Sequence, residues 1–367
     1  AASDVYKRQI MKLMNILLAG LLLWGAAACS DDDKPTFPEE PAYDMTGFAK
    51  GADVSWLTQM EASGKKFYNA SGRETECMTL LRDLGMNSIR LRVWVNPSDG
   101  WCNKSDVVAK AWRAHQLGMR VMIDFHYSDV WADPGSQYKP AAWVGLSLDE
   151  LKTAIADHTK DVLNALKEKG ITPEWVQVGN EITPGMLWDE DATVSGATYD
   201  VPKEGVTYAK NEKNFADFIT TGSNAVKEVF PNAKVIVHLH DGNNNGTYRW
   251  IFDILKANNT PYDVIAMSLY PGTDNWQEMV AACVANMEDM VSRYNKEVMI
   301  AEVGMPWDEP EISKSCLTEL IAKSKAIEQC LGVFYWEPQS YGSWNGYTLG
   351  AFDESGKPTV ALDAFNQ

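Results

Sequence analysis

The chain has 367 residues, of which 45% are hydrophobic, and 50 acidic against 33 basic residues give a net charge of −17. This length and composition suffice for one large buried core. So negative a surface repels a phosphate backbone, and we therefore expect no nucleic-acid partner. The chain also contains 14 Trp and 14 Tyr. Most of these should pack in the core, and we expect several to line a sugar groove, because flat pyranose faces stack on aromatic rings.

The first 29 residues are predicted to be a leader and a targeting segment rather than part of the fold. Residues 1–10 fit no targeting pattern and are expected to be a non-native leader that precedes the natural start at Met11. The apolar run 16–24 is followed by small residues directly before Cys29, which resembles a bacterial lipoprotein signal peptide. We therefore expect Cys29 to be lipidated. An ordinary secretory peptide with an incidental cysteine is the alternative.

Residues 30–45 are predicted to be a tether. Three aspartates follow Ser30, a pattern that resembles the export signal of surface lipoproteins in Bacteroides-type bacteria. Pro35, Pro38 and Pro41 then indicate a stiff, solvated segment. No later stretch is long and apolar enough to span a bilayer. The sequence thus predicts an extracytoplasmic protein at the cell surface, held to the outer membrane only by its lipid anchor.

The remaining cysteines are Cys77, Cys102, Cys283, Cys316 and Cys330. An odd number without CxxC spacing argues against a zinc site or a complete disulfide framework. At most two disulfides could form, and buried free thiols are expected for several of these residues. We predict no metal site.

From residue 46 to residue 367, short apolar runs alternate with amphipathic stretches of helical period, as in one catalytic domain. The predicted strands are 49–55, 88–94, 120–126, 175–180, 234–240, 263–270, 298–302 and 332–337. The predicted helices are 74–84, 106–117, 148–168, 214–229, 248–256, 276–294 and 313–327. Eight such strands alternating with helices predict an α/β fold, a (β/α)8 TIM barrel. We expect the protein to be a monomer. A doubly wound open sheet is the alternative, but no Gly-rich phosphate loop follows any strand.

Polar and aromatic residues gather at the ends of the predicted strands, where a barrel of this type has its active site. The ends of strands two to eight carry Arg90, Arg92 and Trp94; His126; Asn180 and Glu181; His238 and His240; Tyr270; Glu302; and Trp336 and Glu337. Solubility alone would explain a polar residue at any one end. One shared pocket explains seven such ends better.

Two of these residues form a pair suited to glycoside hydrolysis. Glu181 and Glu302 end strands four and seven, which lie nearly opposite each other in an eight-stranded ring. Hydrolysis needs one carboxylic acid to protonate the leaving oxygen and one carboxylate to attack or to activate water. A separation of about 5 Å would predict a retaining mechanism. A structural salt-bridged role is the alternative for each glutamate.

The motifs around these residues resemble glycoside hydrolase family 53, the arabinogalactan endo-β-1,4-galactanases. The matching segments are Gly51 to Ser55, Arg90 to Pro97, Asp124 to Asp129, Trp131 to Gly135, Val176 to Ile182, Gly185 to Trp188 and Asp263 to Ile265. The resemblance covers about residues 46–365, and uninterrupted runs of this length are highly specific.

The resemblance implies roles for the matching positions only. Glu181 would be the acid/base and Glu302 the nucleophile, and Arg90 or Arg92 would keep the nucleophile ionised. The subsite next to the cleaved bond would be completed by His126, Asn180, Tyr270, Asp53 and the platform Trp336. Trp94, Trp131, Trp188 and Trp344 are candidate walls of the groove.

The chain departs from the family pattern after Glu302. Family members usually have Glu-Thr-Gly-Tyr-Pro there, whereas this chain has Val303 and Met305 in place of the Thr and the Tyr. Some bacterial members hold calcium in long loops after strands seven and eight. The segment 308–313 is short and has no run of oxygen ligands at suitable spacing, so we predict no structural calcium. The short loop 339–347 is expected to shorten the glycone side of the groove.

The sequence therefore predicts a retaining, endo-acting hydrolase of pectic β-1,4-galactan that needs no cofactor. The same barrel acting on another β-linked polysaccharide, such as mannan or cellulose, is one alternative. A surface lipoprotein that binds glycan without cleaving it is another, although a pure binder would have no reason to keep both glutamates.

Overall fold

The computed structural model describes residues 43–183, 185–188 and 209–366. The predicted leader, the signal peptide with Cys29 and most of the tether lie outside these residues. The part of the chain from Tyr43 onward forms one compact unit. In its described segments, no helix has both the length and the apolar character required to cross a bilayer.

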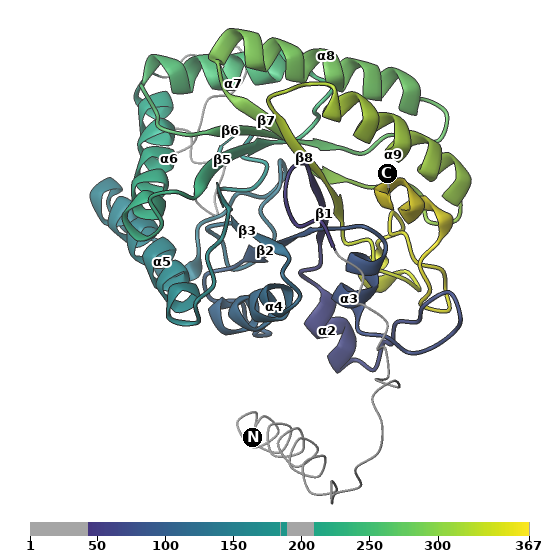
Figure 1. Cartoon of the computed structure of the whole chain (residues 1–367). Coiled ribbons are helices and arrows are strands. Elements are labelled where there is room, and N and C mark those ends of the chain that lie inside the picture. Colours follow the sequence, from purple (N-terminus) through teal and green to yellow (C-terminus); the bar gives the residue numbers. More distant parts are fainter. Residues whose placement is uncertain (1–42, 184, 189–208, 367) are drawn as a thin grey trace, which may run out of the picture. The chain divides into compact units, whose positions relative to one another are not determined.

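Eight parallel strands form a closed barrel in chain order, which confirms the predicted (β/α)8 fold (Figure 1). The strands are β1 Ala49–Asp53, β2 Ser88–Val93, β3 Arg120–Phe125, β4 Trp175–Val178, β5 Lys234–Leu239, β6 Val264–Leu269, β7 Glu297–Val303 and β8 Cys330–Trp336. Closure comes from the pairing of β1 with β8, which runs from Ala49 opposite Gly332 to Asp53 opposite Trp336.

Helices surround the barrel in Figure 1, and each predicted helix is present within a few residues of its predicted bounds. They are α3 Cys77–Asp83, α4 Lys104–Gln116, α5 Leu148–Glu168, α6 Ala209–Val229, α7 Asn245–Ala257, α8 Trp276–Tyr294 and α9 Pro310–Lys325. The sequence pattern missed α2 Leu57–Ala62 and the 3-10 helices η1 Ala141–Trp143, η2 Trp344–Gly346 and η3 Val360–Asn366. These four are too short to display a helical period.

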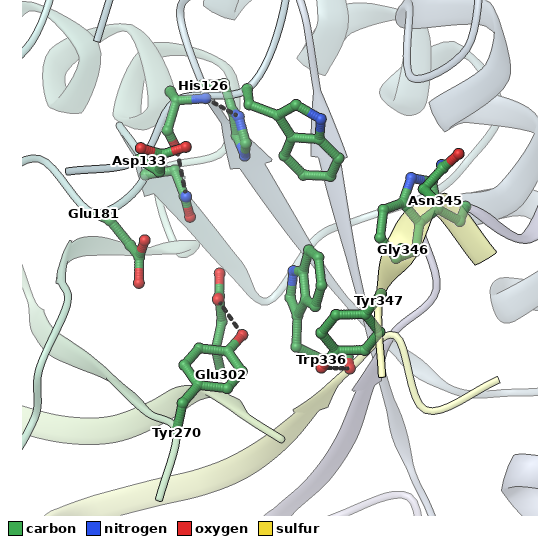
Figure 2. Close-up of a pocket in the computed structure, with 13 residues that line it drawn as sticks. His126, Asp133, Glu181, Tyr270, Glu302, Trp336, Asn345, Gly346 and Tyr347 are labelled. Carbon is green, nitrogen blue, oxygen red and sulfur yellow. Dashed lines mark hydrogen bonds between the residues drawn. The ribbon is translucent and has the colours of Figure 1, made fainter. Parts of the chain in front are cut away.

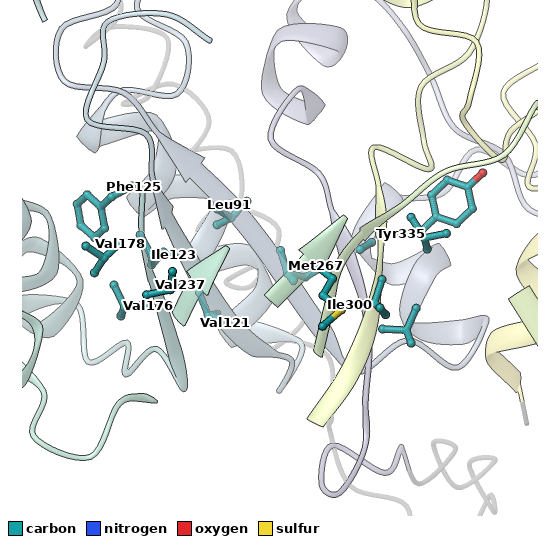
Figure 3. Close-up of a cluster of buried hydrophobic side chains, with 14 of the residues drawn as sticks. Leu91, Val121, Ile123, Phe125, Val176, Val178, Val237, Met267, Ile300 and Tyr335 are labelled. Carbon is teal, nitrogen blue, oxygen red and sulfur yellow. The ribbon is translucent and has the colours of Figure 1, made fainter. Parts of the chain in front are cut away.

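Alternate strand residues divide the apolar interior into two cores, as the two-residue period of a strand requires. One set faces the helices and includes Val121, Ile123, Val176, Val237 and Ile300 (Figure 3). The other set fills the inside of the barrel and consists of Ala49, Met122, Trp175, Ile236, Val264, Ala266, Met299, Ala301 and Phe334. The inner core closes one end of the barrel to solvent.

Toward the carboxyl ends of the strands, the inward-facing positions change from apolar to polar. The next inward residues along the strands are Asp53, Arg90, Asp124, Gln177, His238 and Ser268, each at most 1% exposed. Burial of so many polar groups is costly unless they bond to one another, and here they do. This polar layer is the floor of the candidate site.

Most strands end one or two residues earlier than the sequence pattern predicted. Strand four was predicted to reach Asn180 but ends at Val178, because Gly179 has φ +83° and Glu181 has φ +45°. Tyr127, Asp241 and Glu337 also have positive φ directly or shortly after their strands. These left-handed residues break the strand pairing.

Candidate active site

A cavity of about 450 Å³ opens above the polar layer, at the carboxyl ends of the strands. Its lining comes from segments far apart in the sequence: Trp56, His126, Trp131, Ala132, Asp133, Asn180, Glu181, Tyr270, Glu302, Trp336, Asn345, Gly346 and Tyr347. Figure 2 shows Glu181, Tyr270 and Glu302 on one side of the cavity and Trp336 and Tyr347 on the other. The cavity thus brings together seven of the residues that the sequence predicted at the site: His126, Trp131, Asn180, Glu181, Tyr270, Glu302 and Trp336.

Glu302 is held by one guanidinium and one phenol. Arg90 Nη1 lies 2.9 Å from Glu302 Oε1, and the Tyr270 hydroxyl donates to Oε2 over 2.7 Å. Both groups favour the ionised carboxylate. The sequence had left open whether Arg90 or Arg92 keeps Glu302 ionised, and the structure places Arg90 against that carboxylate.

A bulge in β7 turns Glu302 toward the cavity. Met299 and Ala301 face the inside of the barrel, so in a regular strand the side chain of Glu302 would face the helices. The pairing of β7 shifts register on both sides: Met267 lies opposite Ile300, but Ser268 lies opposite Glu302. The additional residue moves Glu302 to the inner face, a use of bulges that is common next to active sites.

Glu181 has a different environment from Glu302. Its Oε1 accepts a hydrogen bond of 2.6 Å from Ser268, and no cation pairs with it among the described residues. Its backbone is in the left-handed region, which disfavours a residue with a side chain. This conformation directs the carboxyl group of Glu181 into the cavity (Figure 2).

These environments separate the two carboxyl groups in acidity. Burial, and then the negative charge of Glu302, raise the pKa of Glu181 to about 8. Burial also raises the pKa of Glu302, but the Arg90 guanidinium and the Tyr270 hydroxyl oppose this effect. A proton shared by the pair therefore resides on Glu181, which leaves Glu302 ionised at neutral pH.

Asn180 and His126 lie beside the pair with their hydrogen bonds largely satisfied. Asn180 Nδ2 donates to the Ala132 carbonyl over 2.8 Å, and Asn180 Oδ1 accepts from Arg90 Nη2 over 2.8 Å. His126 Nδ1 accepts from Trp94 Nε1 and from the Ala132 amide, both at 3.1 Å. His126 Nε2 is therefore the protonated nitrogen and donates to Asp124.

Three of the predicted substrate-binding residues, Asp53, Arg92 and Trp94, do not line the cavity. Asp53 is fully buried and pairs with Arg90 Nη1 at 2.7 Å. Arg92 pairs with Glu337 at 2.8 Å. Trp94 lies behind His126 and donates to it. Arg92 and Trp94 were expected at the site because they lie at the end of strand two, and Asp53 because of the family resemblance, but all three side chains pack beneath the lining of the cavity.

The aromatic wall differs from the predicted one. Trp131 lines the cavity, whereas Trp344 does not, although its neighbours Asn345 to Tyr347 do. Trp188 lies farther along the surface against Tyr138, with ring centroids 5.7 Å apart. The Arg92 guanidinium lies over the Trp131 ring, 4.2 Å from its centroid, and supports that ring from beneath.

The sequence pattern missed Trp56, Asp133 and Tyr347 as lining residues. Trp56 directly follows the Gly51 to Ser55 motif, and Asp133 belongs to the motif Trp131 to Gly135, so both positions carried a signal. Tyr347 lies in the loop after β8 and carried none. Its ring packs at 4.8 Å from Trp336.

No cluster of three or more His, Cys, Asp or Glu side chains suited to a metal ion occurs within the described ranges. The expectation of no structural calcium stays a prediction.

A closed (β/α)8 barrel that presents two carboxyl groups of unequal acidity in one cavity has the architecture of a barrel glycoside hydrolase. Residues 49–365 match the model of glycosyl hydrolase family 53. The chain belongs to this family and is a glycoside hydrolase.

The chain is also similar to individual known proteins. A Niallia circulans protein described as "Uncharacterized protein in bgaB 5'region" is 39% identical over 85% of this chain and 89% of its own length. The endo-β-1,4-galactanase of Bacillus subtilis is 31% identical over 79% of this chain and 70% of its own length. A solved structure of a fungal β-1,4-galactanase superposes with a TM-score of 0.78 at 28% identity, covering 88% of this chain and all of that one.

Proposed function

We propose that the protein hydrolyses β-1,4-galactosidic bonds within pectic galactan, the type I arabinogalactan, with retention of anomeric configuration. The observation that carries this proposal is the unequal pair: Glu302 bonded to Arg90 and Tyr270, and Glu181 with its pKa raised to about 8. The substrate is inferred from the galactanases among its relatives.

The two carboxyl groups suffice for a double displacement. In the first step, Glu302 attacks the anomeric carbon, the bond to the glycosidic oxygen breaks, and Glu181 gives that oxygen its proton. A covalent galactosyl ester on Glu302 results. In the second step, the Glu181 carboxylate takes a proton from a water molecule, whose oxygen attacks the anomeric carbon and releases Glu302. Neither step requires a cofactor.

The remaining lining residues serve the sugar in this proposal. Asn180 and His126 lie next to the reacting pair. The second hydrogen of the Asn180 amide would bond a sugar hydroxyl, whereas His126, whose ring nitrogens both bond within the protein, would pack against the sugar. Trp336 would be the platform under the sugar ring, and Trp131 a wall of the groove. Arg92 and Trp94 would act on substrate only through Trp131 and His126, which they contact.

Digestion of purified galactan, mannan and carboxymethylcellulose in parallel tests the substrate and the endo action together. We expect galactan alone to be cut, with a rapid fall in viscosity and early release of oligosaccharides. Proton NMR of the first products should show the β-anomer before mutarotation. Activity confined to mannan and carboxymethylcellulose would refute the substrate, and an initial α-anomer would refute retention.

Two variants test the assigned roles. Glu302→Ala should abolish hydrolysis and retain galactan binding, and near-normal turnover would refute its role as nucleophile. Glu181→Ala should be rescued by azide on an activated aryl substrate, which would yield a β-galactosyl azide. Absence of rescue would leave Glu181 without support as acid/base.

We further propose that Cys29 carries a lipid that anchors a monomeric enzyme to the outer membrane, facing the cell exterior. Support comes from the small residues before Cys29 and the acidic run after it. Incorporation of labelled palmitate that is lost in Cys29→Ala, together with cleavage of the protein by protease added to intact cells, is the expected result. Unlabelled protein, or protein protected from the protease, would contradict it.

A further inference from the structure

A chain of buried hydrogen bonds leads from Gln177 to the carboxyl group of Glu181. Gln177 Nε2 lies 3.0 Å from His238 Nδ1, His238 Nε2 lies 2.9 Å from Ser268 Oγ, and Ser268 Oγ lies 2.6 Å from Glu181 Oε1. Gln177, His238 and Ser268 are at most 1% exposed. They come from three neighbouring strands, β4, β5 and β6, and none lines the cavity.

Arg90 determines the orientation of the first member of this chain. Its Nε and Nη2 donate to Gln177 Oε1 over 3.3 and 3.1 Å. A guanidinium has only donors, so the oxygen of the Gln177 amide must face Arg90 and its NH2 group must face away. That NH2 group has two hydrogens and lies near three acceptors: the Gly179 carbonyl at 3.1 Å, Asn180 Oδ1 at 3.0 Å and His238 Nδ1 at 3.0 Å. His238 Nδ1 can accept one of these hydrogens only in the neutral ring with the proton on Nε2.

The other neighbour of His238 Nδ1, Asn180 Oδ1 at 3.1 Å, already has two donors. It accepts from Arg90 Nη2 over 2.8 Å and from Gln177 Nε2 over 3.0 Å. A proton on His238 Nδ1 would be a third donor to this oxygen. It would also oblige His238 Nε2 to accept the Ser268 proton. Once Glu181 has given up its proton in the first step, two oxygens 2.6 Å apart, Ser268 Oγ and Glu181 Oε1, would then have no proton between them.

The electrostatic surroundings of His238 disfavour a charged ring. It is fully buried, and the neighbouring positive or ionisable groups are Arg90 on β2, His126 after β3 and His240 after β5. Burial and then Arg90 hold the pKa of His238 well below its ordinary value. Glu181 itself faces Glu302, Arg90 and Asp133.

We propose that His238, as the neutral Nε2–H tautomer, fixes the single proton of Ser268 on Glu181 Oε1 and so reserves Oε2 for the proton given to the leaving group. His238 and Ser268 are positioning residues for the acid/base, an inference that rests on the proposed function of Glu181. The same Arg90 guanidinium contacts Glu302 at 2.9 Å. One cation therefore orients the nucleophile directly and the acid/base through three intermediates.

Nitrogen NMR of the full, unaltered chain tests the tautomer, and a variant is needed only to assign the signal. The chain has five histidines, and His238→Gln identifies the signal of His238. We expect a neutral ring with Nε2 protonated and Nδ1 unprotonated throughout the pH range of activity. A proton on Nδ1, or an imidazolium, would overturn the proposal.

Ser268→Ala tests the effect on catalysis. A positioned general acid contributes about 10²- to 10⁴-fold when the leaving group is poor and little when it is good. We expect kcat/KM for galactan to fall at least about 10-fold, and kcat/KM for a dinitrophenyl β-1,4-galactobioside to change less than about threefold. Ser268→Thr, which keeps the hydroxyl, should recover much of the activity on galactan. Equal losses on both substrates, or no loss on galactan, would refute the positioning role.

Two further variants separate this inference from the proposed function. Ser223→Ala removes another buried serine hydroxyl, on α6, that has no partner among the described residues, and should leave both substrates unaffected. Glu181→Ala should itself lose galactan activity selectively. If Glu181→Ala shows this selectivity and Ser268→Ala does not, the proposed function stands and the hydrogen-bond chain has no catalytic role. If Glu181→Ala loses activity equally on both substrates, the proposed role of Glu181 as acid/base is refuted, and the inference on His238 and Ser268 is refuted with it.

Discussion

Arg90 is the residue on which the polar layer of the barrel depends. Its guanidinium contacts three carboxylates, those of Asp53, Asp124 and Glu302, at 2.7 to 2.9 Å. Three buried negative charges around one positive charge leave a net negative site. A net negative site suits chemistry in which positive charge develops on a sugar, as in an oxocarbenium-like transition state.

Tyr270→Phe tests the contribution of the phenol to the nucleophile. The hydroxyl donates to Glu302 over 2.7 Å and lowers the pKa of that carboxyl group. Without this hydroxyl the pKa of Glu302 rises. As the pH is lowered, Glu302 therefore becomes protonated at a higher pH than in the unaltered enzyme, and the proposed nucleophile is no longer ionised. We expect the acidic limb of the kcat/KM profile to move upward in pH, and kcat/KM on its plateau to fall about 10-fold, since a hydrogen bond to a charged group contributes roughly 1.5–3 kcal/mol.

A matched control is Tyr248→Phe on α7. Its hydroxyl is also buried and donates over 2.8 Å, but to the Leu239 carbonyl rather than to a carboxylate. Its pH profile should match that of the unaltered enzyme. An unchanged acidic limb in Tyr270→Phe would show that this hydroxyl does not influence Glu302.

The alkaline limb should report the acid/base. In the proposed mechanism Glu181 is protonated in the first step, and with its pKa at about 8 we expect kcat/KM for galactan to decline above about that pH. The Asp133 carboxylate contributes to the raised pKa of Glu181. Asp133→Asn should therefore lower the pKa and move the limb to lower pH, on the order of half a unit. A limb that moves upward, or that persists on a dinitrophenyl galactoside, would contradict the assignment.

At the residue scale, the sequence predicts the reacting pair better than its support. Glu181 and Glu302 follow apolar runs, and their cost of burial marks them as functional. Gln177 and Ser268 lie in the same strand ends but resemble ordinary polar residues, because nothing in one sequence tells which partners a buried amide or hydroxyl will meet. For the same reason, the sequence did not decide which of Arg90 and Arg92 contacts Glu302.

At the scale of elements, strands and helices followed from alternation and helical period, but the bulge in β7 did not. A bulge adds one residue to a strand without changing its composition, and the run from Glu297 to Val303 is apolar apart from its glutamates. The strand pattern therefore did not predict that Glu302 faces inward. That prediction rested on the need for a second carboxyl group in the site. The early end of β4 could not be predicted from the strand pattern either, because it depends on the left-handed backbone at Gly179 and Glu181.

The contact of α6 with β4 supports the strand that carries Glu181. A Cβ on Gly222 would lie 2.5 Å from Val178 Cγ1 and 2.9 Å from the Tyr127 hydroxyl, so α6 approaches the strand at the one residue without a side chain. Gly222→Ala should overpack this contact at a cost of about 1–3 kcal/mol, which corresponds to a Tm lower by roughly 2–6 °C in calorimetry.

Gly246→Ala on α7 is the matched control. Both glycines are helical, but the nearest atom to a Cβ on Gly246 is the exposed Asn244 side chain at 3.6 Å. Because alanine favours a helix more than glycine does, Tm should be unchanged or slightly higher. Equal Tm values for the two variants would show that α6 can withdraw from β4 without cost.

At the scale of the whole molecule, the barrel relies on packing rather than on covalent links. Cys77, Cys102, Cys283, Cys316 and Cys330 are all free and buried. Burial raises the pKa of each thiol, which disfavours the reactive thiolate. The composition indicated free thiols, but only the fold shows that none of these five is paired.

Thiol titration checks this account of stability. In the full chain carrying Cys29→Ser, we expect no reaction with a thiol-specific dye in the native state and five reacting thiols in guanidinium chloride. Tm should not change when a reducing agent is added. Rapid reaction of a native thiol, or a Tm that falls on reduction, would contradict the described packing.

The left-handed backbone of Glu181 has a consequence for how such a protein changes over generations. Its φ of +45° and the burial of its carboxyl group both lower the stability of the fold. We expect the residue to be retained for its role in catalysis. We expect Glu181→Gly to raise Tm while hydrolysis of galactan is lost, whereas a lower Tm would show that the residue also stabilises the fold. A descendant with glycine at this position would keep the aromatic groove. We expect it to have a higher free energy of unfolding and to bind glycan without cleaving it. If Glu181→Gly has the expected Tm, the passage of this barrel from a hydrolase to a glycan receptor would be a step toward greater stability.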